Sequence, residues 1–318
     1  MSLAGWCALL LIAAAAGTGC RSESDVSEAE AAEVAARQQR LTARIAAAQG
    51  DSAVPLARWI LPEDLREVSG VALLPDGRLL AHNDERSRVY VIDPRVGKVI
   101  KTFGVGGAAG IVADFEAITT SGSDIYMLVS DGTIYRFREG ADGASVPFTR
   151  IDTRLGKECE FEGIAVDDSA SFILPCKTIG DKSLRNQIMI YRWRAVAGGE
   201  PIISTITIPL ADAVGSNDWK KLSLSDIAID PATGNYVMIT GPERAMIEVT
   251  RNGDVVQSRP LPGKPQQPEG IAISRQGMMI LSDEAVTREA DITLYKWPLA
   301  GTPAPDTARA TTIAGDSV

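Results

Sequence analysis

The stretch PEGIAISRQGMMILSD, residues 268–283, contains two short apolar segments separated by a polar turn that includes Gly277. Such a pair of segments around Arg275-Gln-Gly is typical of two antiparallel strands joined by a tight turn. The same motif recurs along the chain, five times in all. Its copies begin at Ser69-Gly-Val-Ala, Glu116-Ala-Ile-Thr, Glu162-Gly-Ile-Ala, Ser225-Asp-Ile-Ala and Glu269-Gly-Ile-Ala.

The spacing of this motif predicts the fold class. Its copies start at residues 69, 116, 162, 225 and 269, with one longer gap in which residues 211–222 can form a helix. Each copy is followed by further strand-like segments, and we expect fourth strands at 99–103, 148–152, 202–208 and 255–261. Four antiparallel strands in a unit of about 45 residues are typical of a propeller blade, whereas a β-sandwich needs no fixed repeat. The sequence therefore predicts an all-β chain that forms a single β-propeller with five four-stranded blades.

The two ends of the repeat region predict how the ring closes. The fifth copy has no obvious fourth strand after 291–297, but the apolar segment 56–61 precedes the first copy as fourth strands precede the others. We predict that 56–61 pairs with 291–297, because this closure removes free sheet edges. The propeller would occupy residues 53–297, and residues 298–318, with three prolines, would form a C-terminal tail.

The first fifty residues indicate export. The run LLLIAAAA at 9–16 is too short to span a bilayer and is typical of a signal peptide at residues 1–20. Its small-residue end before Cys20 resembles a lipobox, which predicts a lipoprotein anchored through Cys20 to a bacterial membrane and facing the periplasm or exterior; ordinary secretion is the alternative. Residues 21–52, rich in Ala, Glu, Gln and Arg, predict a helical spacer, with a coiled coil as the alternative.

Composition excludes several functional classes. A net charge of −9 argues against a nucleic-acid partner, which usually requires a basic face. His82 is the one histidine in the chain, so no multi-histidine metal site is possible. No nucleophile elbow or phosphate-binding glycine loop is present. His82 itself is either a general base or, as is more common for a lone histidine, a hydrogen-bonded structural residue.

The order of the motifs resembles a known family. Ser69-Gly-Val-Ala, Asp114-Phe-Glu-Ala-Ile, Glu160-Phe-Glu-Gly-Ile-Ala and Pro268-Glu-Gly-Ile-Ala are similar to the blades of the SdiA-regulated (YjiK-type) propellers. The resemblance covers most of residues 56–297. It implies a location in the cell envelope, a five-bladed, phytase-like propeller and, for some members, a role linked to calcium. It carries over no catalytic residue.

Acidic side chains recur at equivalent positions of the repeats. The start of a first strand and the end of a second strand meet at the same mouth of the central channel. Close carboxylates raise each other's pKa unless a charge compensates them, and Ca2+ does so with about 6–8 oxygen ligands. We therefore expect a Ca2+ or ligand site here, with pairing to arginines as the alternative; Lys177 makes the charge mixed, which suits an acidic ligand. The candidate residues are Glu116, Glu162, Glu269, Asp131, Asp283, Asp84 and Glu85.

Two functions remain open. The first is a binding or regulatory protein whose partner is a cation, a small ligand or another protein. The second is a calcium-dependent phosphoesterase resembling the propeller phytases. Phosphate chemistry needs cationic groups around the transferred group. Lysines and arginines are sparse near the predicted mouth outside the third repeat, which favours binding.

The third repeat also predicts a disulfide. Cys159 lies just before its first strand, and Cys176 ends its second strand. The turn between these strands places the two residues roughly opposite each other, within the ~7 Å between Cα atoms that a bridge allows. An exported protein keeps such a bond, because its compartment is oxidising. Two separate buried thiols are the alternative.

Overall fold

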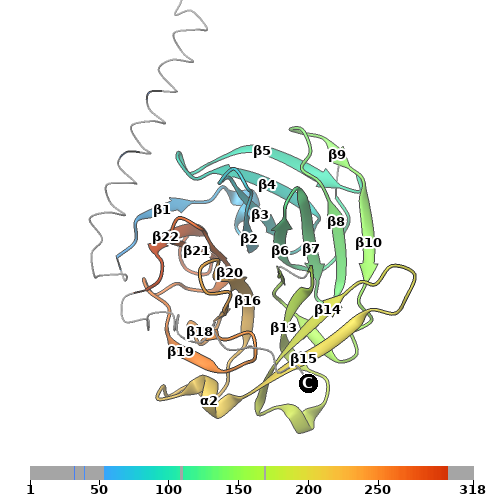
Figure 1. The fold of residues 1–318 in the computed structure, drawn as a ribbon. Helices are drawn as coiled ribbons and strands as arrows, with labels where there is room; N and C mark the ends of the chain where they lie inside the picture. The colour runs from blue at the N-terminus through green and yellow to red at the C-terminus, as the bar shows by residue number, and fades with distance from the viewer. Residues whose placement is uncertain (1–31, 33–38, 40–53, 108–109, 168–169, 300–318) are drawn as a thin grey trace, which may run out of the picture.

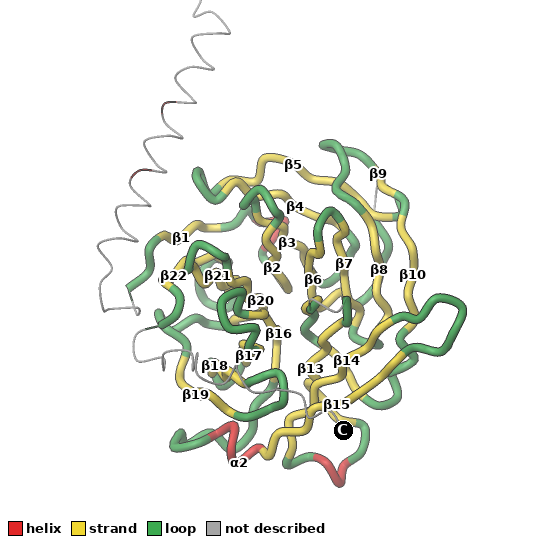
Figure 2. The backbone as a smooth tube through the Cα atoms, viewed as in Figure 1, coloured by secondary structure: helices red, strands yellow, loops and turns green. Residues whose placement is uncertain are grey.

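The computed structural model describes residues 32, 39, 54–107, 110–167 and 170–299. The predicted signal peptide, the helical spacer, Cys20 and nearly all of the C-terminal tail lie outside these ranges. The described chain forms five sheets around a central axis, as Figure 1 shows in ribbon form and Figure 2 by secondary structure. This arrangement confirms the five-bladed propeller. Within these ranges no helix is long and apolar enough to cross a membrane.

The first two blades follow the predicted strand order, from the channel outward. Blade 1 consists of β2 (Val68–Leu73), β3 (Leu79–Asn83), β4 (Arg88–Asp93) and β5 (Lys98–Val105). Blade 2 consists of β6 (Phe115–Ser121), β7 (Asp124–Val129), β8 (Thr133–Phe137) and β10 (Phe148–Asp152). An added short strand, β9 (Ser145–Val146), pairs in parallel with β5 and links the two blades.

The third and fourth blades contain the longer gap. Blade 3 consists of β11 (Cys159–Phe161), β12 (Ala165–Val166), β13 (Phe172–Ile179), β14 (Gln187–Arg194) and β15 (Ile202–Pro209). Blade 4 consists of β16 (Leu224–Ile229), β17 (Tyr236–Thr240), β18 (Ala245–Val249) and β19 (Val255–Pro260). The helix expected between them is only α2 (Leu210–Val214), because Gly215 adopts φ 58° and ends it.

Blade 5 joins the first and last strands of the part of the chain that the structure describes. It consists of β20 (Pro268–Ile273), β21 (Met278–Asp283), β22 (Asp291–Lys296) and β1 (Ala57–Ile60). β1 pairs antiparallel with β22, with Ala57 opposite Leu294 and Ile60 opposite Asp291. The predicted closure by residues 56–61 is therefore confirmed. Short 3-10 helices, η1 (Glu63–Leu65) and η2 (Lys182–Leu184), occupy two loops.

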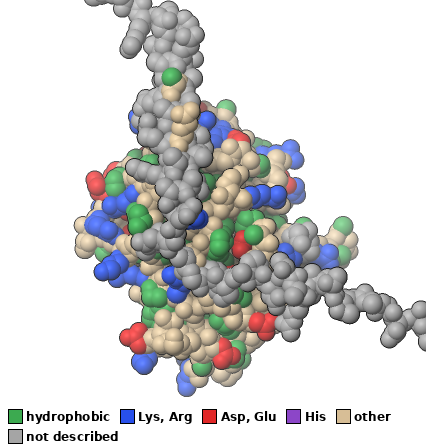
Figure 3. All heavy atoms as spheres, turned by 60° about the vertical axis from the view of Figure 1, so that its left-hand side comes forward, with side chains coloured by type: hydrophobic (Ala, Val, Ile, Leu, Met, Phe, Trp, Pro, Cys, Tyr) green, Lys and Arg blue, Asp and Glu red, His purple; other side chains and the backbone are tan. Residues whose placement is uncertain are grey.

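The blades hold together through apolar faces that pack on each other. One cluster combines Val71 and Leu79 of blade 1 with Ile280 and Ile292 of blade 5, all of them buried. Near the axis the inner strands approach closely, and a Cβ atom on Gly270 would lie 3.0 Å from the Cα atom of Gly70. Where Figure 3 shows described side chains, hydrophobic ones lie in small groups between charged ones.

A bulge recurs at the first residue of the motif and positions the mouth. In blades 1, 2, 4 and 5 the pairing of the inner strand shifts register on either side of Ser69, Glu116, Ser225 and Glu269, respectively. A bulge redirects the side chain of the extra residue. In blade 3 the inner strand is interrupted between β11 and β12, and Glu162 lies in this gap. The same site of each repeat therefore leaves the regular ladder.

Blade 3 also contains the expected disulfide. Cys159 of β11 and Cys176 of β13 are bonded, with their Cα atoms 5.7 Å apart. The bond joins the two strands just beside the interruption of the inner strand. It therefore supports the part of the blade where the inner strand is interrupted.

Candidate functional site: the acidic mouth of the channel

Glu162 and Lys177 form an ion pair at the mouth. Glu162 is 6% exposed and forms an ion pair with the Lys177 ammonium, which projects from β13. A buried carboxylate requires such a partner, because desolvation penalises an unpaired charge. Lys177 also lowers the pKa of Glu116 and of Glu269, so its charge acts on carboxylates from three blades.

Glu116 is the most perturbed of the predicted carboxylates. Burial raises its pKa to about 8, and the carboxylates of Asp114 and Glu269 contribute in the same direction. The Lys177 ammonium opposes this rise but does not cancel it. Glu116 is therefore largely protonated at neutral pH, although it lies at the bulge of β6 beside the channel.

Glu269 occupies the equivalent bulge of blade 5. Burial raises its pKa to about 7, while a hydrogen bond from the Gln267 side chain opposes the rise. The Glu284 carboxylate raises the pKa further, and the Lys177 ammonium lowers it. Glu116 and Glu269 thus share neighbours and destabilise each other's charged form.

Carboxylates of blade 1 also take part in this electrostatic repulsion. Burial raises the pKa of Asp84, and Glu67, Glu85 and Asp114 add to it. Burial likewise raises the pKa of Glu284, with Asp84 as its next cause. These carboxylates form a connected group over blades 1, 2 and 5. We call this group the acidic mouth: Asp84, Asp114, Glu116, Glu269 and Glu284.

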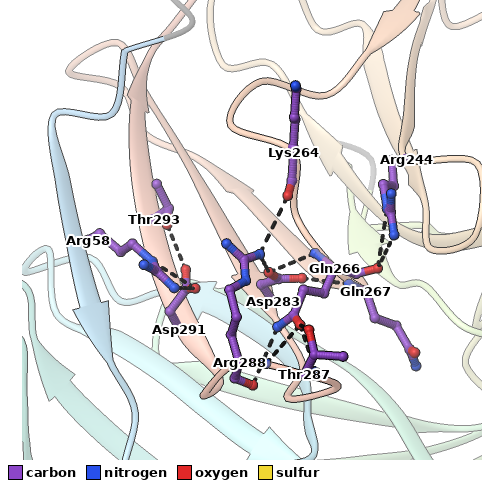
Figure 4. A network of polar contacts seen from close by, with 10 residues as sticks. All are labelled: Arg58, Arg244, Lys264, Gln266, Gln267, Asp283, Thr287, Arg288, Asp291 and Thr293. Atoms are coloured by element: carbon purple, nitrogen blue, oxygen red, sulfur yellow. Dashed lines mark hydrogen bonds and ion pairs between the residues drawn. The ribbon is translucent and has the colours of Figure 1, made fainter.

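Two of the predicted site residues are occupied by loop contacts instead. The Asp283 carboxylate accepts hydrogen bonds from the backbone N–H groups of Gln266 at 2.9 Å and Gln267 at 2.7 Å, and from Arg288 at 3.2 Å (Figure 4). Asp131 is exposed, and its carboxylate accepts a hydrogen bond from the N–H of Thr133 at 2.8 Å. Both side chains therefore stabilise turns of the backbone.

Glu85 and His82 also differ in environment from the rest. Glu85 is exposed and acts on the mouth through the charge that it adds beside Asp84. His82 is fully buried, and burial lowers its pKa to about 4. Its Nδ1 atom lies 2.8 Å from the carbonyl oxygen of Asn83. A neutral, buried imidazole of this kind fits the structural interpretation rather than a general base.

Asp226 is a site residue that the sequence reasoning missed. It occupies the second position of the motif, where the other blades have Gly70, Ala117, Gly163 and Gly270. Its side chain is buried, accepts a hydrogen bond from the N–H of Ile271 at 2.8 Å and interacts with the N–H groups of Ile227 and Ile164. Burial nevertheless raises its pKa well above the usual value. The signal in the sequence that could have identified Asp226 is that an acidic residue stands at a motif position where the other copies have Gly or Ala.

The geometry offers no ready-made metal site. Among the residues that the structure describes, no three His, Cys, Asp or Glu side chains lie close enough together to hold a metal ion. Ca2+ prefers several oxygen ligands at about 2.3–2.6 Å. The mouth carboxylates would have to move toward each other to supply them, and their mutual repulsion opposes this movement until a cation is present.

The fold and the mouth together define a five-bladed β-propeller with an acidic channel entrance. The SdiA-regulated family model matches residues 213–302, which confirms the resemblance predicted from the motifs. No match was found among curated protein sequences.

Two solved structures are similar to this chain. Glutaminyl cyclase from Myxococcus xanthus superposes with a TM-score of 0.51 at 9% identity, over 76% of this chain and 96% of that one. The PQQ-bound aldose sugar dehydrogenase from Streptomyces coelicolor has a TM-score of 0.49 at 13% identity, over 76% and 98%. At these identities the similarity concerns the fold alone.

Proposed function

We propose that the protein is an exported binding or regulatory protein and that its acidic mouth binds a cation. The observation that carries this proposal is the crowding of carboxylates from several blades at one opening, where burial first and neighbouring carboxylates second raise the pKa of Glu116 to about 8 and of Glu269 to about 7. A bound cation favours the ionised carboxylates and relieves this repulsion. Binding should therefore release protons near neutral pH and stabilise the fold by mass action.

Ca2+ is the cation that we expect, because carboxylate oxygens are its usual ligands. It would be held by Glu116 and Glu269, with Asp84, Asp114 and Glu284 nearby. Since no three carboxylates of the described residues are assembled in advance, part of the binding free energy is used to bring them together. The proposal therefore corresponds to weak binding, with a dissociation constant of about 0.1–1 mM, as in other extracellular calcium modules.

The phosphoesterase alternative has less support from the mouth. Stabilising a transferred phosphoryl group requires several cationic groups that are free to contact it. Lys177 is the cation placed among the mouth carboxylates, and it is already engaged by Glu162. A mouth dominated by carboxylates repels a phosphate ester in the absence of metal.

A location in the cell envelope is a separate part of the proposal, and the sequence of the N-terminal residues supports it. We propose that Cys20 is the lipidated first residue of the mature chain, so that the propeller is held at a membrane of the cell envelope. Mass spectrometry of the N-terminal peptide from membrane-extracted protein tests this. A diacylated or triacylated Cys20 is the expected result, and an unmodified Cys20 or a different mature start would refute it.

A thermal titration tests the cation site. The melting temperature should rise in about 5 mM CaCl2 relative to EDTA with NaCl at matched ionic strength, by an amount equivalent to about 1–2 kcal/mol. Glu116→Gln and Glu269→Gln should reduce this rise. Asp218→Asn, which removes an exposed carboxylate after α2, is the control and should retain it.

The outcomes separate the candidate functions. An unchanged melting temperature in CaCl2 would show that the mouth carboxylates are scaffolding and would refute the proposal. Calcium-dependent hydrolysis of p-nitrophenyl phosphate by the same sample would support the phosphoesterase alternative instead. Stabilisation without hydrolysis supports the binding protein.

A further inference from the structure

The opposite end of the channel contains a cavity of about 1150 Å³. It lies beside the turns between first and second strands, at Pro75–Arg78 and Ser274–Gln276. The acidic mouth is formed by the other ends of the same strands, so the two sites are separated by the length of the inner strands. We call this second site the turn-side cavity.

The turn-side cavity is lined by residues of every blade and contains an apolar ring. The third residue of each motif lines it, and all five of these residues are at most 3% exposed. They are branched aliphatic residues throughout. The ring consists of Val71, Ile118, Ile164, Ile227 and Ile271. A large cavity with an apolar ring inside a polar rim suits a small molecule that has both an apolar and a polar part.

Asp226 gives three of these walls a fixed position. Its buried carboxylate accepts a hydrogen bond from the N–H of Ile271 and interacts with those of Ile164 and Ile227. One side chain therefore ties together the inner strands of blades 3, 4 and 5 at the level of the ring. A ligand entering the cavity meets a surface that is already formed, so little conformational entropy is lost there on binding.

The charges at the rim of the cavity are unequal. Three arginines line it together with Asp76 and Asp93. Two of the arginines have acidic partners: Arg78 bonds Glu139 at 2.7 and 2.9 Å and Asp76 at 2.7 Å, and Arg95 bonds Asp93 at 2.6 Å. Arg275, in the exposed turn between β20 and β21, forms no ion pair with any residue of the described ranges. The apolar cavity thus has one uncompensated positive charge at its edge.

From this combination we propose that the turn-side cavity binds an amphipathic small molecule with an apolar chain and a single anionic head group. The chain lies against the Val and Ile ring, and the head group contacts the Arg275 guanidinium. This site is independent of the acidic mouth and does not depend on the function proposed for it. An acidic mouth and an anion-selective cavity place opposite charge preferences at the two ends of one channel.

Isothermal titration calorimetry with straight-chain carboxylates tests the proposal. Octanoate, decanoate and dodecanoate, below their micellar concentrations, should bind to one site, with affinity rising roughly tenfold for each added pair of methylene groups that becomes buried. Arg275→Gln should weaken decanoate binding about 5–20-fold and leave binding of the neutral analogue 1-octanol unchanged. Arg185→Gln, in an exposed loop of blade 3, is the matched control and should bind decanoate normally.

A second variant tests where the ligand binds, because a larger side chain at position 119 would fill the cavity. Thr119, half-buried on β6, lines the cavity, and Thr119→Trp should abolish binding of both decanoate and 1-octanol. Glu116→Gln at the acidic mouth should leave decanoate binding unchanged, which separates this proposal from the cation site. The proposal is overturned if the wild-type protein shows no saturable decanoate binding, if Arg275→Gln binds decanoate as the wild type does, or if Glu116→Gln weakens it as much as Arg275→Gln.

Discussion

Arg58 on β1 donates two hydrogen bonds to one oxygen of Asp291 on β22, from Nε at 2.9 Å and from Nη2 at 2.6 Å. The two residues are 233 positions apart, and their contact lies on the strand pair that closes the ring. Asp291 is 3% exposed, and its other oxygen accepts a hydrogen bond from the Thr293 hydroxyl at 2.6 Å. The side-chain pair thus supplies the partner that a buried carboxylate needs where the first and last strands of the propeller meet.

Arg58→Met should therefore lower the free energy of unfolding by about 1–2 kcal/mol, since it leaves a buried carboxylate without its cation; the loss is smaller than in a fully buried pair because the Arg58 side chain is 41% exposed. The double variant Arg58→Met/Asp291→Asn should recover part of it. Urea unfolding measures both. Arg66→Met, whose pair with Glu63 is exposed at 3.7 Å, is the control and should change stability little. If Arg58→Met and Arg66→Met lowered the free energy of unfolding equally, the role of Arg58 in closing the ring would be contradicted.

Glu116 should make stability depend on pH. Its folded pKa, about 8, lies above the ordinary value of 4.5, so between these values the folded chain holds a proton that the unfolded chain has released. The free energy of unfolding must therefore fall as pH rises through this window. Glu116→Gln cannot ionise, and relative to the wild type it should gain up to about 4 kcal/mol between pH 4.5 and pH 8.5.

Thermal unfolding across this pH range measures the difference. Asp218→Asn serves as the control, because it removes an exposed carboxylate that is not part of the acidic mouth. This variant should keep the wild-type dependence of stability on pH. If Glu116→Gln keeps the full wild-type decline in stability between pH 4.5 and pH 8.5, the raised pKa of Glu116 is wrong.

The pair Lys177–Glu162 should behave as a coupled unit. Lys177→Met leaves Glu162 buried without its cation and also removes the charge that lowers the pKa of Glu116 and Glu269. We expect a loss of about 1–3 kcal/mol for this variant and a smaller loss for Lys177→Met/Glu162→Gln. A double-mutant cycle with both single variants and the double variant, by urea unfolding at pH 7, measures the coupling free energy. If the changes in the free energy of unfolding of the two single variants simply add up in the double variant, Lys177 and Glu162 are not coupled.

Reduction of the Cys159–Cys176 bond should destabilise blade 3. The bond closes a loop with a sequence separation of 17, for which loop-closure entropy predicts about 3 kcal/mol. The double variant Cys159→Ala/Cys176→Ala should unfold at a lower urea concentration than the oxidised wild type and should no longer respond to dithiothreitol. Two free thiols at these positions in unfolded, unreduced wild-type protein would rule the bond out.

Much of the fold was predictable because the information is local. The motif at residues 69, 116, 162, 225 and 269 and the turns that follow it set the number and order of strands, and neighbours along the chain decide these features. The closure by 56–61 followed from the same count, since the fifth blade needed a fourth strand. The sequence also indicated which ends of the strands carry carboxylates.

The tertiary structure alone decided what those carboxylates do. Glu116 and Glu269 are far apart in the chain, yet burial raises the pKa of both, and the Lys177 ammonium of blade 3 lowers both. Asp283, which looks equivalent by position, is taken up by backbone N–H groups of its own loop. Desolvation and Coulomb interaction depend on distances in space, whereas periodicity depends on distance along the chain. For that reason the sequence determined the propeller and its acidic end, and the packing of the blades determined which residues form the mouth and that an apolar cavity lies opposite.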